Sequence, residues 1–174
     1  MDLKYPISQY KPQPFSEELR LQWLHDIQML PQDLERVIEN LDEVQFNTPY
    51  RPDGWTVKQV VHHLCDSHLN AYIRFKLAIL EDNPIIKPYN ENDWAHTTDV
   101  DRVPVNVCTT LLHALHKKWY AFLKDLTQEQ LERTLHHPEH QKDLTVWFLL
   151  GMYAWHGKHH VAHIQSLIDR NNWK

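Results

Sequence analysis

Glycine and positive charge are both scarce in this sequence. Only three of its 174 residues are glycine. The chain therefore has neither the glycine-rich loop of P-loop nucleotide-binding proteins nor the GxGxxG turn of dinucleotide-binding folds. The 18 lysine and arginine residues are outnumbered by 23 aspartate and glutamate residues, which gives a formal net charge of −5. That sign disfavours nonspecific binding to nucleic acid, which depends on neutralising phosphates.

Long apolar runs are missing as well. The first fifteen residues contain no apolar core of a signal peptide, and no later stretch approaches the roughly 20 apolar residues that span a bilayer. We therefore expect no contact with a membrane and a cytoplasmic location. The two cysteines, Cys65 and Cys108, form no CxxC motif, so a disulfide scaffold is not indicated and both are predicted to be buried small hydrophobes.

The residues that are present predict one packed globular domain over 1–174. The hydrophobic share is 42% and the chain holds seven tryptophans, a composition typical of folded proteins. Three prolines within residues 1–15 predict an extended N-terminal arm. Apolar residues recur at helical spacing in four segments, namely 16–41, 57–82, 107–122 and 145–169. Four amphipathic helices without a convincing strand predict an all-α bundle.

The ends of these segments carry capping signals. Ser16 precedes an acidic first turn, and the pairs Thr56 with Gln59 and Thr127 with Gln130 read as capping boxes. Pro31 lies within the first segment, but the apolar stripe continues in phase through it, which predicts a kink. In the third segment the predicted apolar stripe is Val107, Leu111, Leu115, Trp119 and Phe122. The polar segment 134–143 is predicted to be a loop that leads into the last helix.

Histidine is unusually abundant, at 14 of 174 residues. At about 100° per residue, His156 and His160 of the last helix fall on the face that carries Leu149, Tyr153 and Ile164. Two imidazoles at i and i+4 can bind one metal ion. The pair His159 and His163 is a less central alternative.

A catalytic metal site takes three protein ligands, so a third must come from another helix. The second helix offers His62, His63 and His68. A helical wheel places His62 opposite the apolar stripe, His63 on its flank and His68 within it. The wheel disfavours His62 and leaves His63 and His68 open.

The remaining motifs, histidines and cysteine do not indicate a second functional site. The sequence has no ExxH and no GxSxG, which argues against a di-iron bundle and a nucleophile elbow. We expect His136 and His140 to be solvated loop residues, and His113 and His116 to lie on a polar helix face. Cys65 lies roughly 160° around the helix from His63, so it is a poor fourth ligand of a closed structural site.

The segments GWTVKQVVHHLCDSH and YAWHGKHHVAHI resemble the DinB-like/YfiT superfamily of helical metal proteins, and the YfiT branch most of all. The arm LKYPISQYKP and the segments TPYRPDGWTV and NAYIRFKLAI extend the resemblance over nearly the whole chain. The resemblance implies a four-helix bundle that forms a homodimer. It also implies one divalent metal ion held by one histidine of the second helix and an HxxxH pair of the last.

Carried over by position, the ligand of the second helix lies eight residues after Trp55, which gives His63, and the pair gives His156 and His160. Asp66 is close enough along the helix to support a ligand, but a solvated or structural role is equally consistent. Imidazole ligands suit zinc and nickel.

The resemblance implies a metal-dependent hydrolase that activates water for attack on a small-molecule substrate. The alternative is an S-transferase that activates a low-molecular-weight thiol such as bacillithiol. A second alternative is a non-enzymatic bundle that binds a metal or small ligand. The segment 83–104, which contains Tyr89, Trp94 and His96, is expected to form a pocket wall and to supply no ligand.

Overall fold

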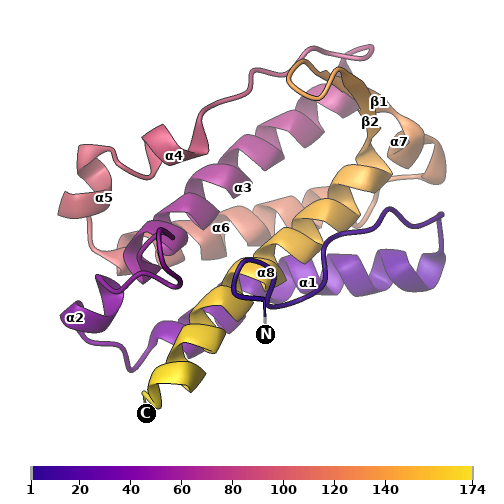
Figure 1. Ribbon diagram of the computed structural model, residues 1–174. Helices are drawn as coiled ribbons and strands as arrows, with labels where there is room; N and C mark the ends of the chain where they lie inside the picture. The colour runs from indigo at the N-terminus through magenta and orange to yellow at the C-terminus, as the bar shows by residue number, and fades with distance from the viewer. Residues whose placement is uncertain (1, 174) are drawn as a thin grey trace.

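The computed structural model describes residues 2–173 and has four long helices (Figure 1). These are α1 (Glu17–Ile38), α3 (Val57–Leu80), α6 (Val105–Leu123) and α8 (Val146–Asn171). The connections hold the short helices α2 (Glu43–Phe46), α4 (Glu91–Trp94), α5 (Thr98–Arg102) and α7 (Gln128–Glu132), and the strands β1 (Thr134–His137) and β2 (Lys142–Thr145). The all-α bundle predicted from the sequence is confirmed.

The long helices form a ring in which α1 and α3 each pack against both α6 and α8. In Figure 1, α8 crosses in front of α1 with α3 on its other side. The helices α3 and α8, which carry the candidate ligands, are therefore neighbours. Among residues 2–173, no helix is both long and apolar enough to cross a membrane.

The capping signals of the sequence are confirmed. The Ser16 side chain accepts a hydrogen bond from the Leu19 amide, and Thr56 and Thr127 each form a reciprocal capping box. Pro31 lies inside α1, which continues through it to Ile38. These caps satisfy backbone groups that would otherwise be unpaired at the helix ends.

The core consists of two apolar clusters along the bundle axis. Trp23, Phe75, Trp119, Leu150 and others form one cluster, and Leu34, Val60, Leu64, Leu112, Ile164 and others form the second. On α6 the first cluster begins at Trp119 and the second ends at Leu112, and His116 lies between them. On α8, His156 and His160 occupy the corresponding interval. A layer of histidines thus separates the two clusters.

The predicted apolar stripe of α6 is confirmed at Leu115 and Trp119, which are buried, but is wrong nearer the start of the helix. Val107 and Leu111 are 50% and 41% exposed, whereas Leu112 and His116 are buried. The buried face repeats as Cys108, Leu112, Leu115, His116, Trp119 and Leu123. The sequence-based stripe leaves out histidine, so its first half follows Val107 and Leu111 instead of the adjacent buried face with Leu112 and His116.

The segment 134–143 also differs from its prediction as a loop, since it forms most of an antiparallel hairpin in which Leu135 pairs with Leu144. Leu135 is fully buried, and the backbone of His136 exchanges hydrogen bonds with Pro84 and Ile86. Each strand has only four residues, which is too short for a periodic signal. The hairpin is stabilised by tertiary contacts that local sequence does not reveal.

The N-terminal arm lies along α8. The indole nitrogens of Trp147 and Trp155 donate to the carbonyls of Gln13 and Ser8, at 2.8 Å and 2.7 Å. The Tyr10 hydroxyl donates to the Phe148 carbonyl at 3.3 Å. The arm is therefore fixed by side-chain to backbone hydrogen bonds over its length.

Candidate metal centre

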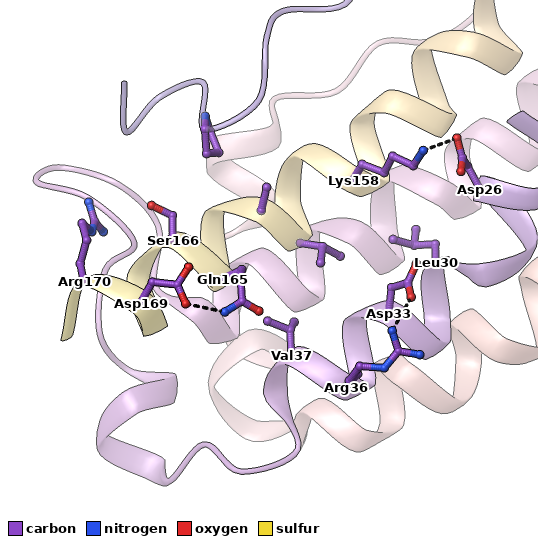
Figure 2. A pocket seen from close by; sticks show the side chains of 13 residues that line it. Asp26, Leu30, Asp33, Arg36, Val37, Lys158, Gln165, Ser166, Asp169 and Arg170 are labelled. Atoms are coloured by element: carbon purple, nitrogen blue, oxygen red, sulfur yellow. Dashed lines mark hydrogen bonds and ion pairs between the residues drawn. The ribbon is translucent and has the colours of Figure 1, made fainter. Parts of the chain in front are cut away.

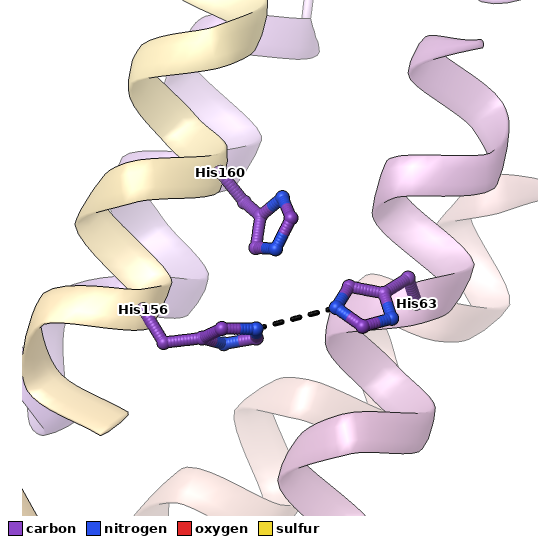
Figure 3. Close-up of side chains that lie close together, drawn as sticks. All are labelled: His63, His156 and His160. Atoms are coloured by element: carbon purple, nitrogen blue, oxygen red, sulfur yellow. Dashed lines mark hydrogen bonds between the residues drawn. The ribbon is translucent and has the colours of Figure 1, made fainter. Parts of the chain in front are cut away.

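His63 of α3 and His156 and His160 of α8 converge between the two helices (Figure 3). One ring nitrogen of each histidine lies within 4.8 Å of the others. The Nε2 atoms of His63 and His156 are 3.2 Å apart. The i, i+4 spacing of the pair on α8 places both rings toward α3, as the helical wheel predicted.

The geometry of this group fits a metal ion. Two nitrogens that bind one ion at 2.0–2.1 Å with tetrahedral angles lie roughly 3.3 Å apart, close to the 3.2 Å between His63 and His156. The His160 ring offers a third nitrogen atom within 4.8 Å of the ligand atoms of His63 and His156.

The three rings are neutral, as metal ligation requires. Burial lowers the pKa of His63 to about 4. Burial and the neighbouring histidines hold the pKa values of His156 and His160 well below the ordinary value. Each ring therefore offers a lone pair at neutral pH.

Two further histidines, His68 and His116, form a chain of hydrogen bonds that begins at His156. His68 Nε2 lies 3.2 Å from His156 Nδ1, and His68 Nδ1 lies 3.0 Å from His116 Nε2. His116 Nδ1 lies 2.5 Å from the Ile27 carbonyl oxygen. The expectation that His116 lies on a polar face was wrong, because it is buried within this chain of hydrogen bonds. His113 of the same helix is partly exposed and pairs with Glu35 at 2.8 Å.

The less central pair on α8 has other partners. His163 Nε2 donates to the Lys4 carbonyl at 3.0 Å, and its ring stacks on Tyr50 at 4.0 Å. His159 stacks on Trp155 at 4.5 Å. Both rings also lie edge-on to His160, at 5.3 Å and 5.4 Å, but neither belongs to the group whose ligand atoms converge.

His62 belongs to a separate buried cluster on the other side of α3. Its Nε2 donates to the Val103 carbonyl at 3.2 Å, and its Nδ1 lies 3.5 Å from Cys108 Sγ. Burial raises the pKa of the nearby Asp66 to about 6, and Asp99 and Cys108 reinforce the shift. Asp66 thus faces this cluster, and it is His68 that contacts His156.

The segment 83–104 lies over the start of α3. The Trp55 ring packs on His63 at 4.7 Å, and its indole nitrogen donates to Asn92 Oδ1 at 3.2 Å. Gln59 donates to the Ala95 carbonyl at 2.9 Å. The Trp94 ring packs at a tilt against Tyr89, with ring centroids 4.5 Å apart, and lines a separate cavity of about 350 Å³. Trp94 therefore does not line the cavity that reaches His156.

A cavity of about 440 Å³ extends to His156 from the side of the hairpin. The segment 83–104 contributes Glu91 to the lining of this cavity, and α8 contributes residues that include Phe148, Met152 and Tyr153. The hairpin contributes Leu135, His137, His140, Lys142 and Leu144. His140 is exposed in the turn of the hairpin, as expected for a solvated loop residue, and it also lines this cavity and stacks on His137 at 4.2 Å. The position of His140 beside the cavity could not be predicted, because the sequence does not predict the hairpin.

A second cavity of about 650 Å³ lies between the outer faces of α1 and α8 (Figure 2). Its rim carries the ion pair between Lys158 and Asp26 at 2.5 Å, and Leu30, Val37 and Val161 are among its apolar residues. Its lining residues do not include the three histidines. This groove is therefore distinct from the histidine site.

The fold and the site together define a class: helical bundles with a three-histidine group between two of their helices. The chain belongs to the DinB superfamily, whose family model matches residues 26–164. Homologues of this chain carry the name "Putative metal-dependent hydrolase", and a three-histidine group is able to bind a metal ion.

Particular relatives match almost the whole chain. A protein of Bacillus cereus (strain ATCC 10987 / NRS 248) named "Putative metal-dependent hydrolase" is 50% identical over 173 residues, which cover 99% of both chains. A protein of Bacillus thuringiensis subsp. konkukian (strain 97-27) with the same description is also 50% identical, over the same share of both chains. Among solved structures, YfiT from Bacillus subtilis is 42% identical, with a TM-score of 0.97 over 100% of both chains. That structure is described as a probable metal-dependent hydrolase with an unusual four-helix bundle topology.

Proposed function

We propose that the protein is a metal-dependent hydrolase in which His63, His156 and His160 bind one divalent ion, zinc or nickel. The observation that carries this proposal is the convergence of three neutral imidazoles from two helices, with ligand atoms within 4.8 Å of one another; His63 and His160 are buried and His156 is half-buried. Three nitrogen ligands leave a further coordination position open. When bound, the ion supplies Lewis acidity, which polarises a carbonyl and lowers the pKa of water.

The protein's own residues hold the site and shape the approach to it. The Trp55 ring covers His63 and shields that side from water. The cavity of about 440 Å³ leads to His156 from the side of the hairpin. Its wall combines apolar side chains with the charged residues Arg74, Glu91 and Lys142. We infer that this cavity admits a small-molecule substrate with both an apolar part and a polar or charged group.

The proposal is tested by a turnover screen of the metal-loaded protein against ester and amide substrates. The screen also includes electrophiles with and without a low-molecular-weight thiol, because a thiol could bind at the same open coordination position of the metal ion. Hydrolysis that depends on the metal and needs no thiol supports the hydrolase. Turnover only with the thiol would replace it with the S-transferase, and no turnover in either arm would favour a bundle that only binds metal.

A cavity-filling variant tests the substrate route. Met152→Trp places a larger ring in the cavity that reaches His156, so we expect lower kcat/KM with unchanged metal content. Ala162→Trp fills the groove between α1 and α8 and is the matched control, with unchanged kinetics expected. The route is wrong if Ala162→Trp impairs turnover and Met152→Trp does not.

A further inference from the structure

The hydrogen bonds that lead from His156 end at a group that can only accept. His116 Nδ1 lies 2.5 Å from the Ile27 carbonyl oxygen, so the hydrogen of this contact belongs to His116 Nδ1. A neutral imidazole has one N–H and one lone pair. Burial lowers the pKa of His116 to about 4, so the ring is neutral and its Nε2 is an acceptor.

The donor and acceptor of each following hydrogen bond are set by the ring before it. His68 Nδ1 lies 3.0 Å from His116 Nε2 and must donate to it. His68 is fully buried among the rings of His116, Trp119 and Tyr153, where a charged imidazole would be costly, so the ring is neutral and its Nε2 carries the lone pair. That atom accepts from His156 Nδ1 at 3.2 Å. The single proton of His156 is therefore on Nδ1, and the lone pair is on Nε2.

His156 Nε2 is the atom that faces His63 in the three-histidine group. We propose that His68 and His116 are positioning residues, which hold His156 in the tautomer and orientation that present its Nε2 lone pair to the metal ion. This inference rests on the proposed metal site. It assigns a role to two histidines that contribute no ligand atom to the group.

The chain of hydrogen bonds also links the site to the whole bundle. It passes from α8 through His68 of α3 and His116 of α6 to the backbone of α1. The rings of His68 and His116 stack at 5.0 Å, and Trp119 and Tyr153 contact His68 edge-on. These contacts restrict ring rotation, so the orientation of His156 depends on the packing of all four long helices.

The experiment compares zinc affinities, measured by competition with a chromophoric chelator. His68→Phe keeps a ring but cannot accept from His156, and we expect it to bind zinc about 10–100-fold more weakly than the wild type, as is typical when the hydrogen-bond partner of a ligand is lost. His68→Gln can both donate and accept, so it should recover most of the affinity. His62→Phe is the matched control on α3 and should bind as the wild type does.

A second measurement needs neither a variant nor a metal. Long-range ¹H–¹⁵N NMR of the metal-free wild type should find the His156 proton on Nδ1. A proton on Nε2, or wild-type affinity in His68→Phe, overturns the positioning role and leaves the metal site standing. Failure of the wild type to bind zinc would overturn the metal site itself. Thermal unfolding in chelator shows whether His68→Phe folds, and the NMR result decides the question if it does not.

Discussion

His156→Ala is expected to weaken zinc binding by more than roughly 100-fold, because loss of a ligand should exceed the 10–100-fold effect of losing a ligand's partner. The nitrogen atoms of His156 lie 3.2 Å from both His63, a second ligand, and His68. Its removal deletes a ligand and also leaves the His68 Nε2 lone pair without a donor. Metal analysis after equilibration with buffered zinc measures the effect.

His163→Ala is the matched control for this variant. His163 is also a buried histidine of α8, but its Nε2 donates to the Lys4 carbonyl of the arm. We expect its zinc affinity to equal that of the wild type. Loss of zinc from His163→Ala with retention in His156→Ala would reassign the ligand pair on α8.

Metal loading is expected to raise the melting temperature by roughly 5–10 °C at a free zinc concentration about 100-fold above Kd. Binding to the native state alone adds about 2.7 kcal/mol under these conditions, and 1 kcal/mol corresponds to about 2–4 °C for a chain of this size. The three ligands join α3 to α8, so the ion acts as a cross-link between neighbouring helices of the ring. Differential scanning calorimetry with chelator and with buffered zinc measures the shift.

The variant His156→Ala separates this stabilisation from nonspecific effects of zinc. Its melting temperature should be the same with chelator and with buffered zinc. An equal rise in the variant and the wild type would mean that zinc stabilises the fold from another site.

Much of the fold could be predicted because local signals and tertiary packing agree. Ser16, Thr56 and Thr127 each mark a helix start by the hydrogen bonds that their side chains accept. The long helices repeat their apolar residues with a clear period. The hairpin could not be predicted, because it has one fully buried residue, Leu135, and depends on backbone bonds to the distant residues Pro84 and Ile86.

The candidate site divides in the same way. Helical spacing alone placed His156 and His160 on the inward face of α8, and the resemblance to the DinB-like/YfiT superfamily favoured His63 over His68. The structure brings these three histidines together. The role of His116 was missed because a histidine within an apolar stripe looks like an interruption. His116 completes the buried face of α6 between Leu112 and Trp119. The helical spacing of these three residues is visible in the sequence.

X-ray absorption spectroscopy of the zinc-loaded protein tests the central claim most directly, because it counts the ligands of the ion. We predict three imidazoles at about 2.0–2.1 Å, with the remaining coordination completed by exchangeable light-atom ligands. A sulfur ligand at about 2.3 Å, which in this chain would require Cys65, Cys108 or a methionine, would contradict the account. So would a shell of fewer than three imidazoles.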